Sequence, residues 1–235
     1  MKNRIVDVNM GWIYLIFIQD YIDLEIQMKI KNIQEIIKRI EWANLKREGG
    51  TCEYIPETIT DLVNNDKKYR EKIYWQYDNN VVVQRYLYDG AFYLIPFLIE
   101  MLKAEDVIEK KEIYDLLYEI GNGSSEFYKM VTYKTENFLF EYYIPHENGV
   151  SLPLEIACRN SVLKGWNIYA NEILNEKSLF RKNALELMFS FIEYKVMQKE
   201  VLEKLFEKEK HTEFYKVAKE YYDEILELIK HDTEI

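Results

Sequence analysis

The sequence predicts an all-α fold, an α-α superhelix (solenoid) of about four helix pairs with an N-terminal cap and an aromatic-rich insertion. From Leu87 onward, apolar residues recur at steps of three and four, which places one apolar stripe on each of several successive helices. Helices in serial pairs bury such stripes by stacking on one another. With only 8 Gly and 4 Pro, the chain has too few turn signals for an all-β sandwich.

Residues 1–41 are predicted to form an N-terminal cap segment that covers the open end of the stack. The apolar run 12–18 fits either a buried strand or the start of a helix, because periodicity does not separate the two over so short a length. Residues 26–40 carry an isoleucine stripe flanked by charged residues, which predicts an amphipathic helix. This stripe either caps the first helix pair or joins two copies of the chain in a homodimer.

Residues 42–235 are predicted to form the helical repeat domain. A glycine pair at 49–50 marks the first break, and the β-branched run 81–83 is expected to be extended. The glycines of 121–124 are expected to end the second pair. The first predicted pair is 56–63 with a helix that follows the turn 64–66 and runs through 77. The other predicted pairs are 88–103 with 109–121, 153–175 with 178–194, and 197–209 with 212–230.

Residues 124–153 form an irregular insertion rich in Tyr and Phe. A connection of this length inside a compact domain is typically either functional or disordered. Seven large rings favour order, because together they can bury a considerable area. We expect an insertion packed on the helices, with a short extended element.

The charge of the chain limits its partners. Thirty-one Lys and Arg against 41 Asp and Glu give a formal net charge of −10. Duplex nucleic acid is therefore not an expected partner unless the basic residues gather on one face. The acidic surplus serves either solubility or the recognition of a basic partner.

Other bulk features indicate a cytoplasmic protein without a membrane span. The longest apolar run is far shorter than the roughly 20 residues that a membrane helix needs, and its flanks do not fit a secretion signal. Cys52 and Cys158 are far apart and outside any CxxC or Cys/His cluster, so no zinc site is predicted.

A search for chemistry predicts no catalytic residue, no cofactor and no metal site. His146 is the best-placed histidine, in the aromatic insertion beside Glu147, but no Ser or Cys nucleophile shows a recognisable spacing from a partner. The stretch 121–125 lacks the Gly-Lys-Ser/Thr ending of a phosphate loop. Asp115 and Glu119 share one helix face, as solvated acidic pairs commonly do.

Several segments resemble bacterial HEAT-repeat proteins, over roughly residues 42–230. The resemblance implies HEAT-like helix pairs, and some such proteins are presumed immunity proteins of polymorphic toxins. The stretch 79–84 lacks the His and Gly that often precede the second pair, so no role for that histidine is carried over. The similar segments are Trp42-Ala43-Asn44-Leu45 with Gly50 and Ile55-Pro56, Tyr88-Asp89-Gly90-Ala91 before Leu94-Ile95-Pro96-Phe97-Leu98, 116–121, and 157–162.

The recognition surface is expected on the second helix of each pair, because these helices line the concave side of a stack. Tyrosine suits such a surface, since it combines a large apolar body with a polar tip. The predicted partner-binding residues are Tyr74, Asp115, Tyr118, Glu119, Glu186, Glu193 and Tyr222, with Arg70 and Lys219 beside them.

These observations lead to three hypotheses of function. The first is a non-catalytic protein-binding module, most concretely an immunity-type inhibitor that covers a basic surface of a bacterial toxin. The second is a scaffold or regulatory HEAT-repeat subunit. The third is a DNA-alkylation-repair-type glycosylase, which would need a basic concave groove for the phosphates.

Overall fold

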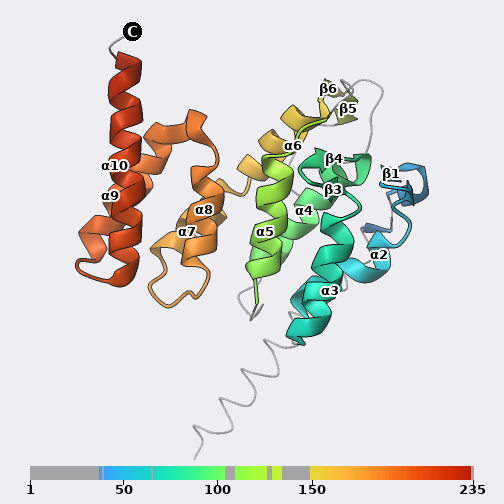
Figure 1. Ribbon diagram of the computed structural model, residues 1–235, viewed down its shortest axis with the longest axis horizontal. Helices are drawn as coiled ribbons and strands as arrows, with labels where there is room; N and C mark the ends of the chain where they lie inside the picture. The colour runs from blue at the N-terminus through green and yellow to red at the C-terminus, as the bar shows by residue number, and fades with distance from the viewer. Residues whose placement is uncertain are drawn as a thin grey trace, which may run out of the picture.

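The computed structural model describes residues 37–38, 40–64, 66–103, 109–125, 129–133 and 149–233, and these are mostly helical (Figure 1). The predicted predominance of helix is confirmed. None of the described helices combines the length and the apolar character that crossing a membrane requires. The helices are η1 (Trp42–Asn44), α2 (Ile55–Thr58), η2 (Ile59–Val63), α3 (Lys67–Asp78), α4 (Asp89–Lys103), α5 (Lys111–Gly121), α6 (Leu154–Leu163), α7 (Trp166–Leu174), α8 (Arg181–Phe189), η4 (Ile192–Tyr194), α9 (Lys195–Lys208) and α10 (Glu213–Thr233).

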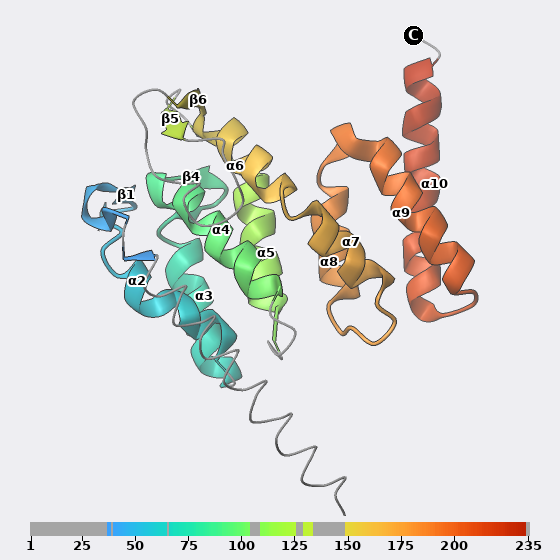
Figure 2. The same cartoon turned by 180° about the vertical axis from the view of Figure 1, so that it is seen from behind.

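The helices lie in two layers. In Figure 1, α3, α5, α8 and α10 follow one another in a row, and α4, α6, α7 and α9 lie behind them; Figure 2 shows the same arrangement from the back, with α4, α6, α7 and α9 nearer the viewer. Helix contacts agree with this arrangement: α5 contacts α3 and α8 within its layer and α4 and α6 in the other, while α7 packs on α8 and α9 on α10. The second helix of each predicted pair therefore lies in the same layer.

Within the residues that the structure describes, three short antiparallel strand pairs accompany the helices. The first joins β1 (Lys46–Arg47) to β2 (Gly50–Thr51), and the second joins β3 (Val82–Val83) to β4 (Tyr86–Leu87). The third joins β5 (Met130–Tyr133) to β6 (Val150–Pro153). The extended conformation expected near 81–83, and a short extended element in the insertion, are thus confirmed.

Several predictions concern residues outside the described part of the chain. Residues 1–36, with the apolar run at 12–18 and most of the stripe at 26–40, lie outside it, and so do 134–148 with His146. The described end of the cap segment packs on the domain, because Trp42 Nε1 donates to the Ile37 carbonyl at 2.7 Å. The Trp42 ring also meets the ring of Tyr93 on α4 edge-on, with centroids 6.5 Å apart.

The core is centred on α4, which is buried over nearly its whole length from Gly90 to Leu102. At the start of this helix the neighbouring chain approaches closely. A Cβ atom on Gly90 would collide with Cys52 Sγ and lie 3.1 Å from Val81 Cγ1. A glycine is therefore required where the β1–β2 hairpin crosses α4.

The predicted helix over 153–175 is wrong: the structure divides it into α6 and α7. Gly165 separates the two helices, and the space for a side chain there is filled by the Tyr169 ring. The Tyr169 hydroxyl donates to the Val162 carbonyl at 2.8 Å, which satisfies one of the last acceptors of α6. The predicted helix 178–194 is shorter as well, because α8 ends at Phe189 and η4 follows separately.

A buried ion pair joins α8 to the connection between α9 and α10. Arg181, at the start of α8, pairs with Glu209, and the two side chains are only 9% and 4% exposed. The Arg181 Nε donates to the Ile173 carbonyl at 2.8 Å, and its guanidinium carbon lies 3.9 Å from the Phe214 ring centroid. Thr212 Oγ1 donates to the second oxygen of Glu209 at 2.9 Å. The pair therefore fixes the position of the last two helices.

We predict that Glu209→Gln lowers the free energy of unfolding by about 3 kcal/mol, because it leaves the Arg181 charge buried without a counter-ion. Urea unfolding followed by circular dichroism measures the loss. The matched control is Glu213→Gln, since Glu213 is 89% exposed and its removal is expected to change stability by less than about 0.5 kcal/mol. Equal effects of the two substitutions would show that the buried pair does not hold this end of the molecule.

Candidate partner-binding groove

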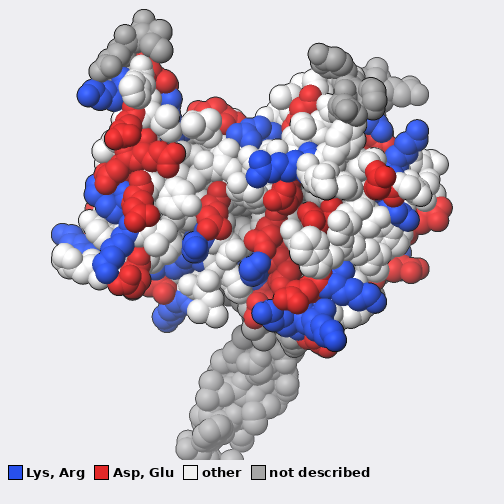
Figure 3. Space-filling model, viewed as in Figure 1, with Lys and Arg blue, Asp and Glu red and all other residues white. Residues whose placement is uncertain are grey.

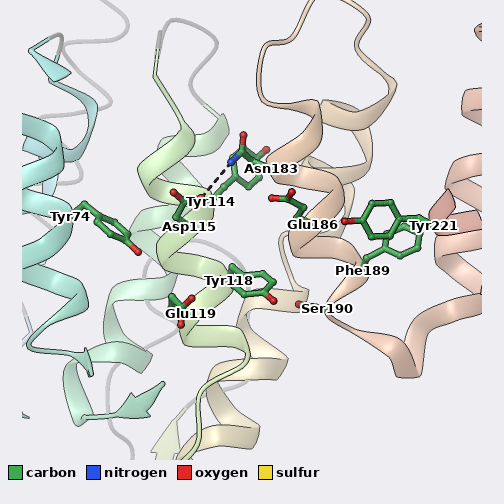
Figure 4. A pocket seen from close by; sticks show the side chains of 10 residues that line it. All are labelled: Tyr74, Tyr114, Asp115, Tyr118, Glu119, Asn183, Glu186, Phe189, Ser190 and Tyr221. Atoms are coloured by element: carbon green, nitrogen blue, oxygen red, sulfur yellow. Dashed lines mark hydrogen bonds between the residues drawn. The ribbon is translucent and has the colours of Figure 1, made fainter. Parts of the chain in front are cut away.

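A groove with a volume of about 490 Å³ opens on the layer formed by α3, α5, α8 and α10 (Figure 4). We call it the inner groove. Each of the four helices contributes at least one side chain to it. Its lining residues are Tyr74, Tyr114, Asp115, Tyr118, Glu119, Asn183, Glu186, Phe189, Ser190 and Tyr221.

Helical periodicity explains why α5 supplies most of one wall. Asp115, Tyr118 and Glu119 are spaced three and four residues apart, so they share one face of the helix. These three are partly exposed, whereas Leu117 and Ile120, on the other faces of the same turns, are fully buried. Burial of the apolar faces therefore orients the polar face into the groove.

The opposite wall comes from α8 and α10. The Asn183 amide donates to Asp115 Oδ1 at 3.4 Å and so bridges α8 to α5 across the groove (Figure 4). The Phe189 and Tyr221 rings pack against each other, with centroids 4.4 Å apart. In Figure 4 the hydroxyls of Tyr74, Tyr118 and Tyr221 point into the groove, so phenol groups and carboxylates alternate along its walls.

The carboxylates of the groove contribute to the raised pKa values of two of its tyrosines, Tyr74 and Tyr221. Burial raises the pKa of Tyr74, and the negative charges of Asp78, Asp115 and Glu119 raise it further. Burial also raises the pKa of Tyr221, with Glu186 as the largest of the charges that add to the shift. In each case the phenolate form is disfavoured first by burial and then by the surrounding carboxylates, so the pKa is raised.

Basic side chains lie beside the groove carboxylates, and each is more exposed to solvent than the carboxylate that it pairs with. Arg85 Nε is 3.7 Å from Glu119, and Lys182 Nζ is 3.6 Å from Glu186. Lys111 pairs with Asp115 one helical turn away. The exposed fractions of the three basic side chains are 57%, 66% and 60%. Exposed pairs of this kind contribute little to stability and exchange readily with other charges.

The space-filling view shows the hollow between α5 and α8, with acidic side chains on both of its sides (Figure 3). Among the described residues, no group of three or more His, Cys, Asp or Glu side chains is placed to hold a metal ion. The features that stand out in the groove are therefore its carboxylates, phenol groups and aromatic ring faces.

Five of the seven sequence-predicted residues meet in the inner groove. They come from three helices that are far apart along the chain, so the row of helices is what brings them together. Their role in binding a partner stays a prediction. The five residues are Tyr74, Asp115, Tyr118, Glu119 and Glu186.

The other two predicted residues lie elsewhere. Glu193 is on η4 rather than on α8, where it forms an ion pair with Arg159 of α6 at 2.6 Å. Tyr222 faces α9, because its hydroxyl donates to Glu203 at 3.0 Å and its ring packs on Phe206. Glu193 lies outside the groove because α8 ends earlier than predicted. Tyr222 lies outside it because the rotation of α10 points the neighbouring Tyr221 into the groove instead.

The two basic residues expected beside the surface are also absent from the groove lining. Arg70 is only 2% exposed and pairs with Glu112 at 3.5 Å, so the prediction that it faces solvent is wrong. Lys219 remains partly exposed and pairs with Asp223 on its own helix.

Sequence reasoning missed half of the lining. Tyr221 belongs to the apolar stripe of α10 by its spacing, which predicts a core position, yet its hydroxyl reaches the groove. Asn183 stands three residues before Glu186, and this helical spacing is a signal that would have found it. Missed lining residues are Tyr114, Asn183, Phe189, Ser190 and Tyr221.

Comparison with protein-family models, curated proteins and solved structures finds no match to this chain. The resemblance to bacterial HEAT-repeat proteins therefore stays a prediction. Any function has to be argued from the inner groove itself.

We predict that the double variant Asp115→Asn/Glu119→Gln lowers the pKa of Tyr74 toward its ordinary value, because two nearby negative charges no longer oppose the phenolate. The pKa stays above the ordinary value, since burial is the larger cause and is retained. Carbon-13 NMR of labelled tyrosine Cζ, with Tyr74→Phe for assignment, measures the titration. Glu213→Gln is the control, and a Tyr74 pKa that responds equally to both variants would contradict a local field in the groove.

Proposed function

We propose that this chain is a non-catalytic protein-binding module, a curved row of HEAT-like helix pairs whose inner groove binds a basic protein. The most concrete form of the proposal is an immunity-type inhibitor that covers the basic active site or substrate groove of a bacterial toxin. The observation that carries it is the convergence of Asp115, Glu119 and Glu186 with tyrosines from three helices in one groove.

Charge supports a basic partner. The chain has a formal net charge of −10, and within the described part of the chain the groove carboxylates pair with exposed lysine and arginine side chains that a partner's cations can replace. Complementary charge accelerates encounter and suppresses wrong partners, which suits an inhibitor that must capture its target quickly. The same carboxylates repel phosphate groups, and this disfavours the glycosylase hypothesis.

The aromatic side chains support a protein as the ligand. Tyr74, Tyr118 and Tyr221 are half-buried, so they lose little conformational freedom when a partner covers them. Tyrosine is among the residues that contribute most to protein interfaces, because it combines a large contact area with a hydroxyl.

The choice between inhibitor and scaffold depends on the family resemblance, because a groove of this kind serves either role. An inhibitor blocks the activity of its partner, whereas a scaffold binds the partner and leaves it active. Expression of the neighbouring gene with and without this chain distinguishes the two. Restored growth on co-expression favours the inhibitor, and an unaffected but bound partner favours the scaffold.

We predict that a basic protein is captured by the wild type and at least about tenfold less by Asp115→Asn/Glu119→Gln/Glu186→Gln, because three desolvated charge contacts are lost. Quantitative mass spectrometry of proteins retained on the immobilised chain measures capture. The matched control Glu57→Gln/Glu200→Gln/Glu207→Gln removes the same charge from exposed sites outside the groove. Equal capture by both triple variants would contradict binding through the groove.

We also predict that association of the captured protein slows about tenfold or more when salt is raised from about 50 to about 200 mM, while dissociation changes less. Surface plasmon resonance with the purified partner measures both rates. A partner whose association rate is insensitive to salt would contradict electrostatic capture by the acidic groove.

A further inference from the structure

A basic side chain of the protein itself, Arg85, contacts two residues that line the inner groove, Tyr118 and Glu119, without being part of the lining. Arg85 lies in the turn between β3 and β4, far along the chain from α5. Its guanidinium carbon is 5.9 Å from the centroid of the Tyr118 ring, and its Nε is 3.7 Å from Glu119 Oε2. These are the two kinds of contact that a guanidinium makes with aromatic and acidic groups in a binding site.

The turn holds Arg85 in this position against its backbone preference. The strand register pairs Val83 with Tyr86, so Gln84 and Arg85 form a two-residue turn, and both have positive φ, 50° and 66°. Asn-Gly is the favoured pair for such a turn, because a Cβ atom makes positive φ costly, glycine lacks that atom and asparagine tolerates the conformation better than most residues. The Ser124 N–H donates to the Arg85 carbonyl at 2.8 Å and fixes the turn next to α5.

We propose that the inner groove is a receptor for an arginine side chain of the partner, and that Arg85 is an internal occupant of the Tyr118 and Glu119 contacts at the edge of this groove, which the incoming arginine replaces. This inference rests on the proposed function and adds the chemistry that the groove recognises.

The lining favours arginine over lysine. A guanidinium is planar and weakly hydrated, so it stacks on rings and bonds carboxylates at the same time, whereas an ammonium is a compact, strongly hydrated charge. Tyr118 and Glu119 offer a ring and a carboxylate side by side, with Asp115 one helical turn away. Volume is sufficient as well, since about 490 Å³ exceeds what one arginine side chain fills.

Replacement of Arg85 is inexpensive. Its side chain is 57% exposed, so its contacts with Tyr118 and Glu119 are weak and largely hydrated. A partner arginine that enters the groove is more completely desolvated and makes the same contacts more strongly. Arg85 therefore lowers the apparent affinity for arginine by the fraction of time that it occupies the site.

The test uses the full chain and short capped peptides, tetra-arginine and tetra-lysine, with spermidine as a small-molecule cation, measured by isothermal titration calorimetry at one low salt concentration. We expect tetra-arginine to bind the wild type more tightly than either other cation. Arg85→Gly is expected to bind tetra-arginine about fivefold more tightly, because the internal competitor is gone. Glycine also suits the positive φ of this position, so the variant is expected to fold.

Two further variants separate the loss of the Arg85 guanidinium from the relief of strain in the turn, and the contribution of the Tyr118 ring from that of the groove charges. Gln84→Gly relieves the same turn without removing the guanidinium, and is expected to leave the affinity for tetra-arginine unchanged. Tyr118→Leu keeps the charge but removes the ring, and is expected to weaken tetra-arginine binding severalfold. Thermal melts establish that each variant is folded before its affinity is compared.

The outcomes distinguish this inference from the proposed function. Unchanged or weaker binding of tetra-arginine by folded Arg85→Gly would overturn the role of Arg85 as an internal occupant. Equal binding of tetra-lysine, spermidine and tetra-arginine, or none of them, would overturn the preference for a guanidinium. Either result leaves the capture of a basic protein by the groove to be judged by the triple variants, which test the groove without assuming arginine.

Discussion

Burial of the apolar faces of α5 is the constraint on which the rest of the structure depends. This helix contacts α3 and α8 in its own layer and α4 and α6 in the other. Ile113, Leu117 and Ile120 are fully buried, so the helix cannot rotate without exposing them. The polar face that remains is the one that carries Asp115, Tyr118 and Glu119 into the inner groove. Core packing and the chemistry of the groove are thus set by the same helix.

Basic residues play two different parts in this acidic chain. Arg70 with Glu112, Lys110 with Glu172, and Arg181 with Glu209 are well-buried pairs, and each joins neighbouring parts of the row of helices. Pairs of this kind specify which helices meet, since breaking one leaves an uncompensated charge. The cations beside the groove are exposed and paired loosely, so they are free to give way to a partner's charges. Ion pairs with a buried cation hold the helices together, whereas ion pairs with an exposed cation can exchange with the charges of a partner.

The β3–β4 hairpin supplies one of the exposed cations beside the groove, Arg85. Its strained turn brings Arg85 to Tyr118 and Glu119, where the protein's own guanidinium makes the contacts that we infer for a partner. Residues in such backbone conformations persist only when the surroundings over-determine them. Here the strand pairing and the Ser124 N–H supply that constraint. We infer that the helices give the groove a rigid frame and that Arg85, at its edge, is an exchangeable side chain.

Sequence alone determined the helical character, most helix boundaries and the face of α5 that meets solvent, because these follow from local periodicity of apolar residues. It also determined the acidic surplus and five of the groove residues. The break at Gly165, where the Tyr169 ring fills the space for a side chain, and the early end of α8 are not marked by the periodicity of apolar residues. Tertiary structure decided the burial of Arg70, since Arg70 pairs with Glu112, which is distant in the sequence. It alone decided that Tyr221 and not Tyr222 faces the groove, because the rotation of α10 is set by its packing on α8 and α9. Spacing along one helix is written in the sequence, whereas the rotation of helices against one another is fixed only when they pack.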